Sequence, residues 1–332
     1  MVALVALAGG AAQQAPTFAS HVASLSEPGG YFDTDNLISN ERSYLQILPE
    51  LRRANLSGGA YVGVGPDTNF SYIAAVRPEI AFIIDIRRDN LLLHLLFKAL
   101  FELSATRLEY LAQLLGRPLP LAVDGWRTAP IERIVTYLDR GNAAPPALQA
   151  LRGRVDAAVK RTGVTLTAED LATIARFHQR FIDEGLGLRF NSAGRPPQAH
   201  YPSYRDLLLE TDSAGQQGNY LASEEAYQFV KSLHARHLII PVVGDLSGPS
   251  ALTAIGKLLS TRGQQLTVFY ASNVEYYLHG QGTFARFVTN LRQMPRTRNS
   301  VIIRSVFGRG LRNTRPFDGS SSQVEAIEDV IK

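Results

Sequence analysis

The sequence predicts an α/β protein with a Rossmann-like, mostly parallel sheet that is interrupted by a helical insertion. Two observations lead to this fold class. Short, continuously apolar segments alternate with helical segments toward both ends of the chain, which is typical of a parallel sheet covered on both faces. Between them, residues 105–236 carry helical patterns without a convincing strand, and this stretch is too long for a simple connection.

The first half of the sheet domain is expected in residues 31–104, where hydrophobic periodicity and turn residues define the elements. In chain order they are a helix at 36–53, a strand at 60–64, a helix at 69–76, a strand at 80–86 and a helix at 88–103. The turn Gly65-Pro66-Asp67 follows the first strand, and Asp85 lies near the end of the second.

The insertion, residues 105–236, is expected to cover the strand ends as a lid or partner surface. Its predicted helices lie at 107–115, 131–138, 148–160, 168–184 and 224–235, and Thr167 is a predicted N-cap. The sheet domain resumes at 237–316. Its predicted strands are 237–243, 266–270 and 301–306, and its helices are 249–259 and 284–291. Residues 317–332 are expected to form a C-terminal tail.

Composition excludes several classes of chemistry. The absence of cysteine rules out disulfides, thiolate metal sites and a cysteine nucleophile. His234 and His237 have no third ligand near them in sequence, so no metal site is expected. A net charge of +4 over 332 residues is no strong signal for nucleic acid. No apolar run of 18 residues is present, so no membrane span is predicted.

Arginine supplies 29 of the 34 basic residues, since only five are lysine. The densest run comprises Arg286, Arg292, Arg296, Arg298, Arg304, Arg309, Arg312 and Arg315. We interpret it as a solvated face, with a phosphate-binding face as the alternative.

Residues 1–30 are predicted to be a flexible leader or the remnant of a signal peptide. Residues 1–12 are small and apolar and lack the basic segment of a complete signal. This favours export to the periplasm or medium, with a cytoplasmic location as the alternative.

Polar and glycine residues follow the predicted strands in an order that indicates a ligand site. Ligands of open parallel sheets bind beyond the carboxyl ends of the strands. Gly63 and Gly65 would let a ligand approach the backbone. Asp85 comes twenty positions after Gly65, where a carboxylate can bind ribose hydroxyls. Asp245 and Asn273 follow the next two strands. We therefore expect a small-molecule ligand of the nucleotide type.

The order of Gly63, Gly65, Asp85, Asp245 and Asn273 resembles that of the class I S-adenosylmethionine-dependent methyltransferase superfamily. The stretch YVGVGPDTNFSYIAAVRPEIAFIIDIRRDNLLLHLLFKALFEL is further similar to an uncharacterised group of bacterial proteins with a methyltransferase-like sheet. The narrow resemblance covers residues 31–110 most clearly, and the sheet-level resemblance adds 237–310.

The resemblance implies S-adenosylmethionine as cofactor. Gly63 and Gly65 would line its methionine part, Asp85 would hold the ribose and Asp245 would lie near the adenine. Asp67 replaces the third glycine of the superfamily pattern, close to where the cofactor carboxylate would lie. Methyl transfer rests mainly on positioning. Asn273, Glu275 and His94 are the candidate orienting or basic groups.

Two other functions stay open at this point. One is a non-catalytic, exported protein that keeps the fold and binds another ligand or a protein. The other is an NAD(P)-dependent oxidoreductase, although Thr68 stands where the dinucleotide fingerprint has its third glycine. Asn90, His94, Lys98 and Glu102 recur every four residues as a polar stripe, which we interpret as solvent-facing or salt-bridged, with a cleft-facing stripe as the alternative. The sequence carries no signal for the substrate or the oligomeric state.

Overall fold

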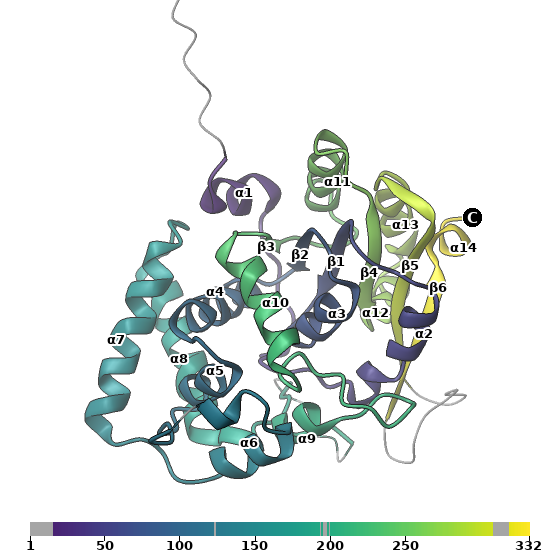
Figure 1. Ribbon diagram of the computed structural model, residues 1–332. Helices are drawn as coiled ribbons and strands as arrows, with labels where there is room; N and C mark the ends of the chain where they lie inside the picture. The colour runs from purple at the N-terminus through teal and green to yellow at the C-terminus, as the bar shows by residue number, and fades with distance from the viewer. Residues whose placement is uncertain (1–15, 123, 193, 195–197, 199, 308–318) are drawn as a thin grey trace, which may run out of the picture.

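The computed structural model describes residues 16–122, 124–192, 194, 198, 200–307 and 319–332 (Figure 1). A six-stranded sheet in the order β3-β2-β1-β4-β5-β6 forms the centre of the molecule. The first five strands in this order are parallel, and only β6 runs antiparallel to its neighbour β5. The prediction of an α/β fold with a mostly parallel sheet is therefore confirmed.

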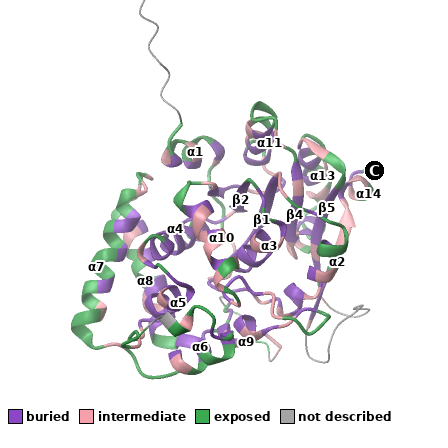
Figure 2. Ribbon diagram, in the orientation of Figure 1, coloured by how far each residue is buried: buried purple, intermediate pink, exposed green. Residues whose placement is uncertain are grey.

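The strands are β1 (Ala60–Val64), β2 (Ile80–Asp85), β3 (Ile239–Val243), β4 (Leu266–Ser272), β5 (Arg296–Phe307) and β6 (Ser320–Ala326). Every residue of β1 and β3 is buried, which explains why continuous apolar runs predicted them. Figure 2 shows the same burial along the centre of the sheet, whereas the outer side of α7 (Pro145–Arg161) is exposed.

Helices cover both faces of the sheet. The chain builds β1, β2 and β3 toward one edge and then adds β4 and β5 on the other side of β1. Right-handed crossovers therefore place the connecting helices of the two halves on opposite faces. One group comprises α3 (Thr68–Val76), α4 (Arg88–Leu103) and α10 (Glu224–Ala235), and the other comprises α11 (Ala251–Thr261), α12 (Val274–Gly280) and α13 (Phe284–Arg292).

The described part of residues 105–236 contains helices and loops with isolated bridges, and no regular strand. Its other helices are α5 (Arg107–Leu114), α6 (Ile131–Leu138), α8 (Ala168–Glu184) and α9 (Tyr204–Leu209), with short 3-10 turns at Asp124–Trp126 and Gly185–Gly187. The predicted Thr167 cap exists as a capping box with Asp170. Asp170 also accepts two hydrogen bonds of 2.8 Å from the Arg88 guanidinium, which fixes α8 to the start of α4.

Both ends of the described chain are more ordered than predicted. Residues 16–30 are no flexible leader, because α1 (Phe18–Leu25) buries Phe18, Val22 and Leu25 against β3 and α11. The expected C-terminal tail contains β6 and α14 (Ile327–Val330). Residues 1–15, on which the export prediction depends, lie outside the described residues.

Two further predictions need correction. The expected helix at 36–53 is broken into a 3-10 turn (Arg42–Leu45) and α2 (Leu48–Arg53), which begins beside Pro49. The polar stripe on α4 is neither solvent-facing nor cleft-facing along most of its length. Asn90, His94 and Lys98 are buried, and only the stripe's last member, Glu102, is exposed and forms an ion pair, with Arg161.

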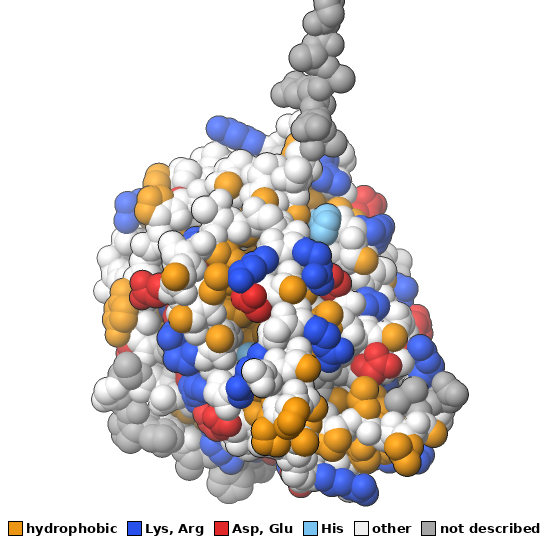
Figure 3. All heavy atoms as spheres, turned by 90° about the vertical axis from the view of Figure 1, so that its left-hand side faces the viewer, with side chains coloured by type: hydrophobic (Ala, Val, Ile, Leu, Met, Phe, Trp, Pro, Cys, Tyr) orange, Lys and Arg blue, Asp and Glu red, His pale blue; other side chains and the backbone are white. Residues whose placement is uncertain are grey.

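The described arginines of the densest basic run are mostly engaged within the protein. Arg296 pairs with Glu328, Arg304 pairs with Glu275 and Glu325, and Arg292 donates to the Ile331 carbonyl. Arg309, Arg312 and Arg315 lie outside the described residues. On the face seen in Figure 3, basic and acidic side chains are interspersed. Among the described helices, none is long and apolar enough to span a bilayer.

Candidate functional site

A cavity of about 120 Å³ opens at the carboxyl ends of β1, β2, β3 and β4. It lies where the strand order reverses direction, which is the position at which open α/β sheets bind ligands. Its walls are formed at the strand ends by residues 64–66, 84–87, 244–246, 270 and 272–274. The other lining residues are Phe32, Thr34, Asn36, Ser39, Asn40, Phe190 and part of α12. We call it the first cavity.

Gly65 and Gly63, predicted as a pair, have different positions. Gly65 lines the first cavity with φ +85°, and a β-carbon added to it would meet only the Asn36 amide nitrogen at 3.4 Å. Gly63 does not line the cavity. A β-carbon there would lie 2.0 Å from Asn69 Oδ1, so this glycine makes room for a side chain of the protein itself.

Asn69 is the reason for that close packing. Its amide group donates to the carbonyls of Val64 (2.9 Å) and Pro66 (2.7 Å), and its oxygen accepts from the Tyr61 hydroxyl at 2.8 Å. Tyr61 therefore helps to hold the turn after β1 from beneath. Three hydrogen bonds of Asn69 thus hold the turn in place, a feature that the sequence pattern does not reveal.

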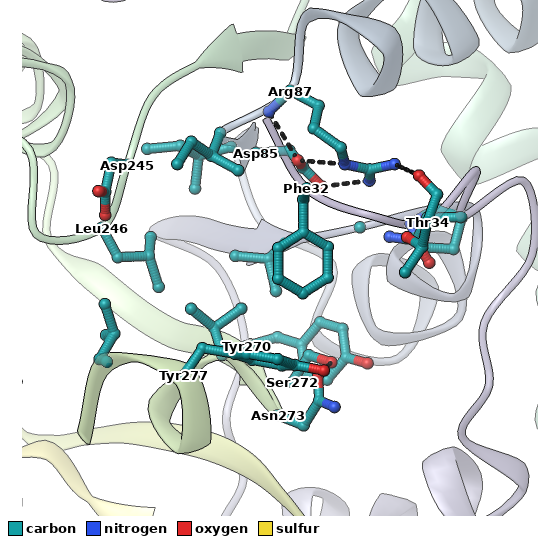
Figure 4. A pocket seen from close by; sticks show the side chains of 18 of the residues that line it. Phe32, Thr34, Asp85, Arg87, Asp245, Leu246, Tyr270, Ser272, Asn273 and Tyr277 are labelled. Carbon is teal, nitrogen blue, oxygen red and sulfur yellow. Dashed lines mark hydrogen bonds and ion pairs between the residues drawn. The ribbon is translucent and has the colours of Figure 1, made fainter. Parts of the chain in front are cut away.

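Asp85 lies on the cavity wall, as predicted, and is engaged by Arg87. The guanidinium donates to both carboxylate oxygens at 3.1 and 2.9 Å, and the Arg87 backbone N–H donates to Oδ1 at 2.9 Å. Arg87 also donates to the Thr34 carbonyl (2.8 Å), so the pair links β2 to the segment that crosses the cavity (Figure 4). No pattern in the sequence indicates this role for Arg87.

Asp245 also lies on the wall, at the opposite side of the view from Thr34 (Figure 4). Its Oδ1 accepts bonds from the Ser247 backbone N–H (2.7 Å) and hydroxyl (2.9 Å). The start of α11 is capped by another acid, because Glu27 accepts bonds from the Ser250 and Ala251 N–H groups. Asp245 is therefore not used as the cap of that helix.

Asp67 turns away from the first cavity. Its Oδ2 accepts hydrogen bonds from the hydroxyls of Tyr204 (3.1 Å) and Tyr220 (3.3 Å), and its side chain is buried. Burial raises the pKa of this carboxyl to about 6. The residue that is expected close to the cofactor carboxylate instead joins the start of α3 to α9 and to the segment before α10.

His94 also lies outside the cavity lining. It is buried on α4, and its Nε2 lies 2.9 Å from the Gly65 carbonyl, so it supports the glycine turn from behind. Burial lowers the pKa of the imidazole to about 4, partly offset by that hydrogen bond. A neutral histidine in this place orients backbone and has no access to a bound ligand.

Asn273 lies in the wall between the first cavity and a second one of about 680 Å³ at the ends of β4, β5 and β6. Four residues line both cavities: Asn40, Ser272, Asn273 and Tyr277. Glu275 lines only the second cavity, where the Arg304 guanidinium pairs with it at 2.9 and 3.0 Å. Of the three predicted catalytic residues, only Asn273 contacts both cavities.

Phe32 projects into the first cavity between the Asp85–Arg87 pair and Tyr277 (Figure 4). Its ring packs edge-on against that of Tyr277, with 4.8 Å between the centroids. The segment that carries it is anchored by the bond from the Gly30 N–H to the Ile86 carbonyl (2.8 Å) and by the bridge between Thr34 and Ser192. No periodicity marks this segment, so its place in the cavity could not be predicted from the sequence.

Glu41 and Asn40, which the sequence offers as substrate contacts or as helix-start residues, have different positions: Asn40 lines both cavities, whereas Glu41 lines neither. Its side chain is fully buried beneath the wall shared by the cavities, and burial raises the pKa of its carboxyl. The hydroxyls of Tyr270, Ser272 and Ser305 all donate to it. Within the described residues, no group of three or more His, Asp or Glu side chains could hold a metal ion.

A family model described as "Domain of unknown function (DUF7790)" matches residues 36–116 and 189–329, about two thirds of the chain. The chain belongs to this family. The match includes every strand and all strand ends that line the first cavity, and it omits residues 117–188, in which α6, α7 and α8 lie. No curated protein matches the chain.

Proposed function

We propose that the protein is an S-adenosylmethionine-dependent methyltransferase whose cofactor binds in the first cavity. One observation carries the proposal: Gly65, Asp85 and Asp245, predicted from three separate strand ends, line one cavity at the point where the strand order reverses. The sheet order, with an antiparallel edge strand, supports a methyltransferase-like fold.

The residues fit the adenosine part of such a cofactor. Gly65 leaves open space beside its backbone, so a ligand can approach there. Asp85 already accepts three bonds from Arg87, but a carboxylate offers about four acceptor positions. One position therefore remains for a ribose hydroxyl. Asp67 is no obstacle, because its carboxylate is held by Tyr204 and Tyr220.

Phe32 occupies space in the first cavity that the ligand would need. A volume of about 120 Å³ is below the roughly 300–1,000 Å³ of sites that enclose ligands of this size. The Phe32 ring occupies the middle of the cavity, so its movement would provide the missing space. We therefore infer that the segment around Phe32 opens for the cofactor and then covers it.

When bound, the cofactor supplies a methyl group on a sulfonium centre. The chain would contribute positioning, because Asn273 and Ser272 form the wall between the first and the second cavity. A non-catalytic ligand-binding protein is the second candidate, and the engagement of Asp85 by Arg87 favours it. The two functions differ in whether a bound cofactor is consumed.

Calorimetric titration with S-adenosylhomocysteine tests the proposal. We expect saturable binding that Asp85→Asn weakens by about 10- to 100-fold, the effect of losing a hydrogen bond to a charged group. Asp89→Asn, which removes the same charge from an exposed position on α4, should leave the affinity unchanged. Absence of binding and of thermal stabilisation at millimolar ligand would refute the proposal. Binding of NADH in its place would favour an oxidoreductase.

A further inference from the structure

The wall between the two cavities contains a buried carboxyl that the proposed function does not use. Glu41 has no exposed surface and accepts hydrogen bonds from three hydroxyls, including that of Tyr270 at 2.8 Å. In the part of the chain that the structure describes, no Lys, Arg or His side chain forms an ion pair with it. A buried acid without a cation is costly, so it calls for an explanation.

Ser272 connects this carboxyl to the cavities. Its hydroxyl donates to Glu41 Oε1, while the residue itself lines both cavities. Ser272 adopts φ +52°, in the left-handed region that non-glycine residues rarely occupy, and the pairing of β4 with β5 is irregular beside it. Strain of this kind is typical of functional positions. The bent backbone turns the serine toward Glu41 at the end of β4.

The second cavity indicates what would lie against Ser272. Aromatic rings line it: Tyr201, Tyr276, Tyr277, His279 and Phe307. Tyr276 is 77% exposed, an unusual state for a large ring that no other part of the described chain covers. The lining acid Glu275 pairs with the lining base Arg304, which also pairs with Glu325 outside the lining. An aromatic lining whose acid and arginine are paired fits a planar, uncharged aromatic compound.

We propose that the second cavity binds a phenol-type methyl acceptor, and that Ser272 and Glu41 remove its hydroxyl proton during methyl transfer. The inference rests on the proposed function. The acceptor oxygen attacks the methyl carbon, and the bond from that carbon to the sulfonium sulfur breaks, leaving a neutral thioether. The phenolic proton passes to Ser272 Oγ as the serine proton passes to Glu41. Ser272 is the catalytic residue, and Glu41 is a positioning residue that receives the proton through it.

The test begins with catechol and 4-methylphenol as probes on the full chain. Calorimetry with S-adenosylhomocysteine first establishes whether the cofactor binds. Saturation-transfer NMR on protein loaded with S-adenosylhomocysteine then reports whether either phenol binds. Finally, mass spectrometry detects the methyl ether formed with S-adenosylmethionine. We expect both phenols to bind and to be methylated.

Variants separate proton removal from binding. Glu41→Gln keeps the size of the side chain, and we expect it to lower kcat by about 100-fold, the typical contribution of a general base. The KM for the phenol and the affinity for S-adenosylhomocysteine should stay within about twofold. Glu41→Asp should restore part of kcat. Ser272→Ala should show the same loss, which keeps the test valid if Glu41→Gln fails to fold. Glu328→Gln, the same change on the outlying helix α14, is the matched control.

Each outcome decides a different claim. Binding of S-adenosylhomocysteine without binding or methylation of a phenol would overturn this inference and leave the proposed function intact. Unchanged kcat in both Glu41→Gln and Ser272→Ala would overturn the role of the pair. No binding of S-adenosylhomocysteine would refute the proposed function, and the inference with it.

Discussion

Replacement of Asp67 by asparagine gives the most quantitative test of the structure. The carboxyl is buried, and its recorded partners are the hydroxyls of Tyr204 and Tyr220. Asparagine has nearly the same shape and can still bond to both hydroxyls, but it carries no charge. The substitution should therefore remove the cost of burying a negative charge and leave the packing intact.

The expected size and sign follow from the pKa of Asp67. Burial raises it from the ordinary 3.8 to about 6, which corresponds to roughly 3 kcal/mol of differential stability. The unfolded chain releases the proton near pH 3.8, whereas the folded protein holds it until about pH 6. The contribution of this raised pKa to the free energy of unfolding of the wild-type protein is therefore complete below pH 3.8 and is lost as the pH rises through 6.

Chemical denaturation of both proteins at about pH 4.5 and pH 7.5 measures this effect. The free energy of unfolding of Asp67→Asn minus that of wild type should increase by about 2 kcal/mol between the two pH values. His94 titrates with the opposite sign in an overlapping range, since its pKa is lowered to about 4, but it is common to both proteins and cancels. Asp89→Asn is the exposed control. An unchanged difference between pH 4.5 and 7.5 would refute the assigned burial of Asp67.

Three further predictions concern other parts of the chain. Gly63→Ala should lower the free energy of unfolding by about 3 kcal/mol or more, because the new β-carbon would collide with Asn69. Gly65→Ala should lower it by only about 1 kcal/mol, because its positive φ is unfavourable for alanine. Equal losses for the two variants in chemical denaturation would contradict their different roles. Phe32→Ala should speed the association of S-adenosylhomocysteine in stopped-flow experiments by about tenfold if entry requires this ring to move, and an unchanged rate would exclude it as a lid. Val22→Ala should destabilise the protein by about 1–3 kcal/mol in chemical denaturation because α1 is docked, and no change would indicate a free segment.

The centre of the sheet could be predicted because its signal is local. β1 was predicted with its observed bounds, Ala60–Val64, since a fully buried parallel strand is a continuous apolar run. β6 carries no such signal because it begins with three serines. Their burial is stabilised by partners far away in sequence, such as the bond of 2.8 Å between the Ser320 and Ser43 hydroxyls. No local sequence pattern indicates a hydrogen-bond partner that lies so far away in the chain.

For the candidate site too, the positions of the residues could be predicted from the sequence, but their contacts could not. Strand ends converge in a parallel sheet, so the positions of Gly65, Asp85 and Asp245 around one cavity followed from their order in the chain. The contacts that determine their chemistry did not follow. Glu41 reaches the site from a segment before the sheet, and whether Asp67 faces the cavity depends on tyrosines more than 130 positions away.

A crystal structure with S-adenosylhomocysteine would decide whether the first cavity binds the cofactor. We expect density for adenosine in the first cavity, with a ribose hydroxyl on the Asp85 carboxylate, the ligand beside the Gly65 backbone and the Phe32 ring displaced from its present position. An unchanged cavity at saturating ligand, or adenosine bound elsewhere on the chain, would contradict this expectation.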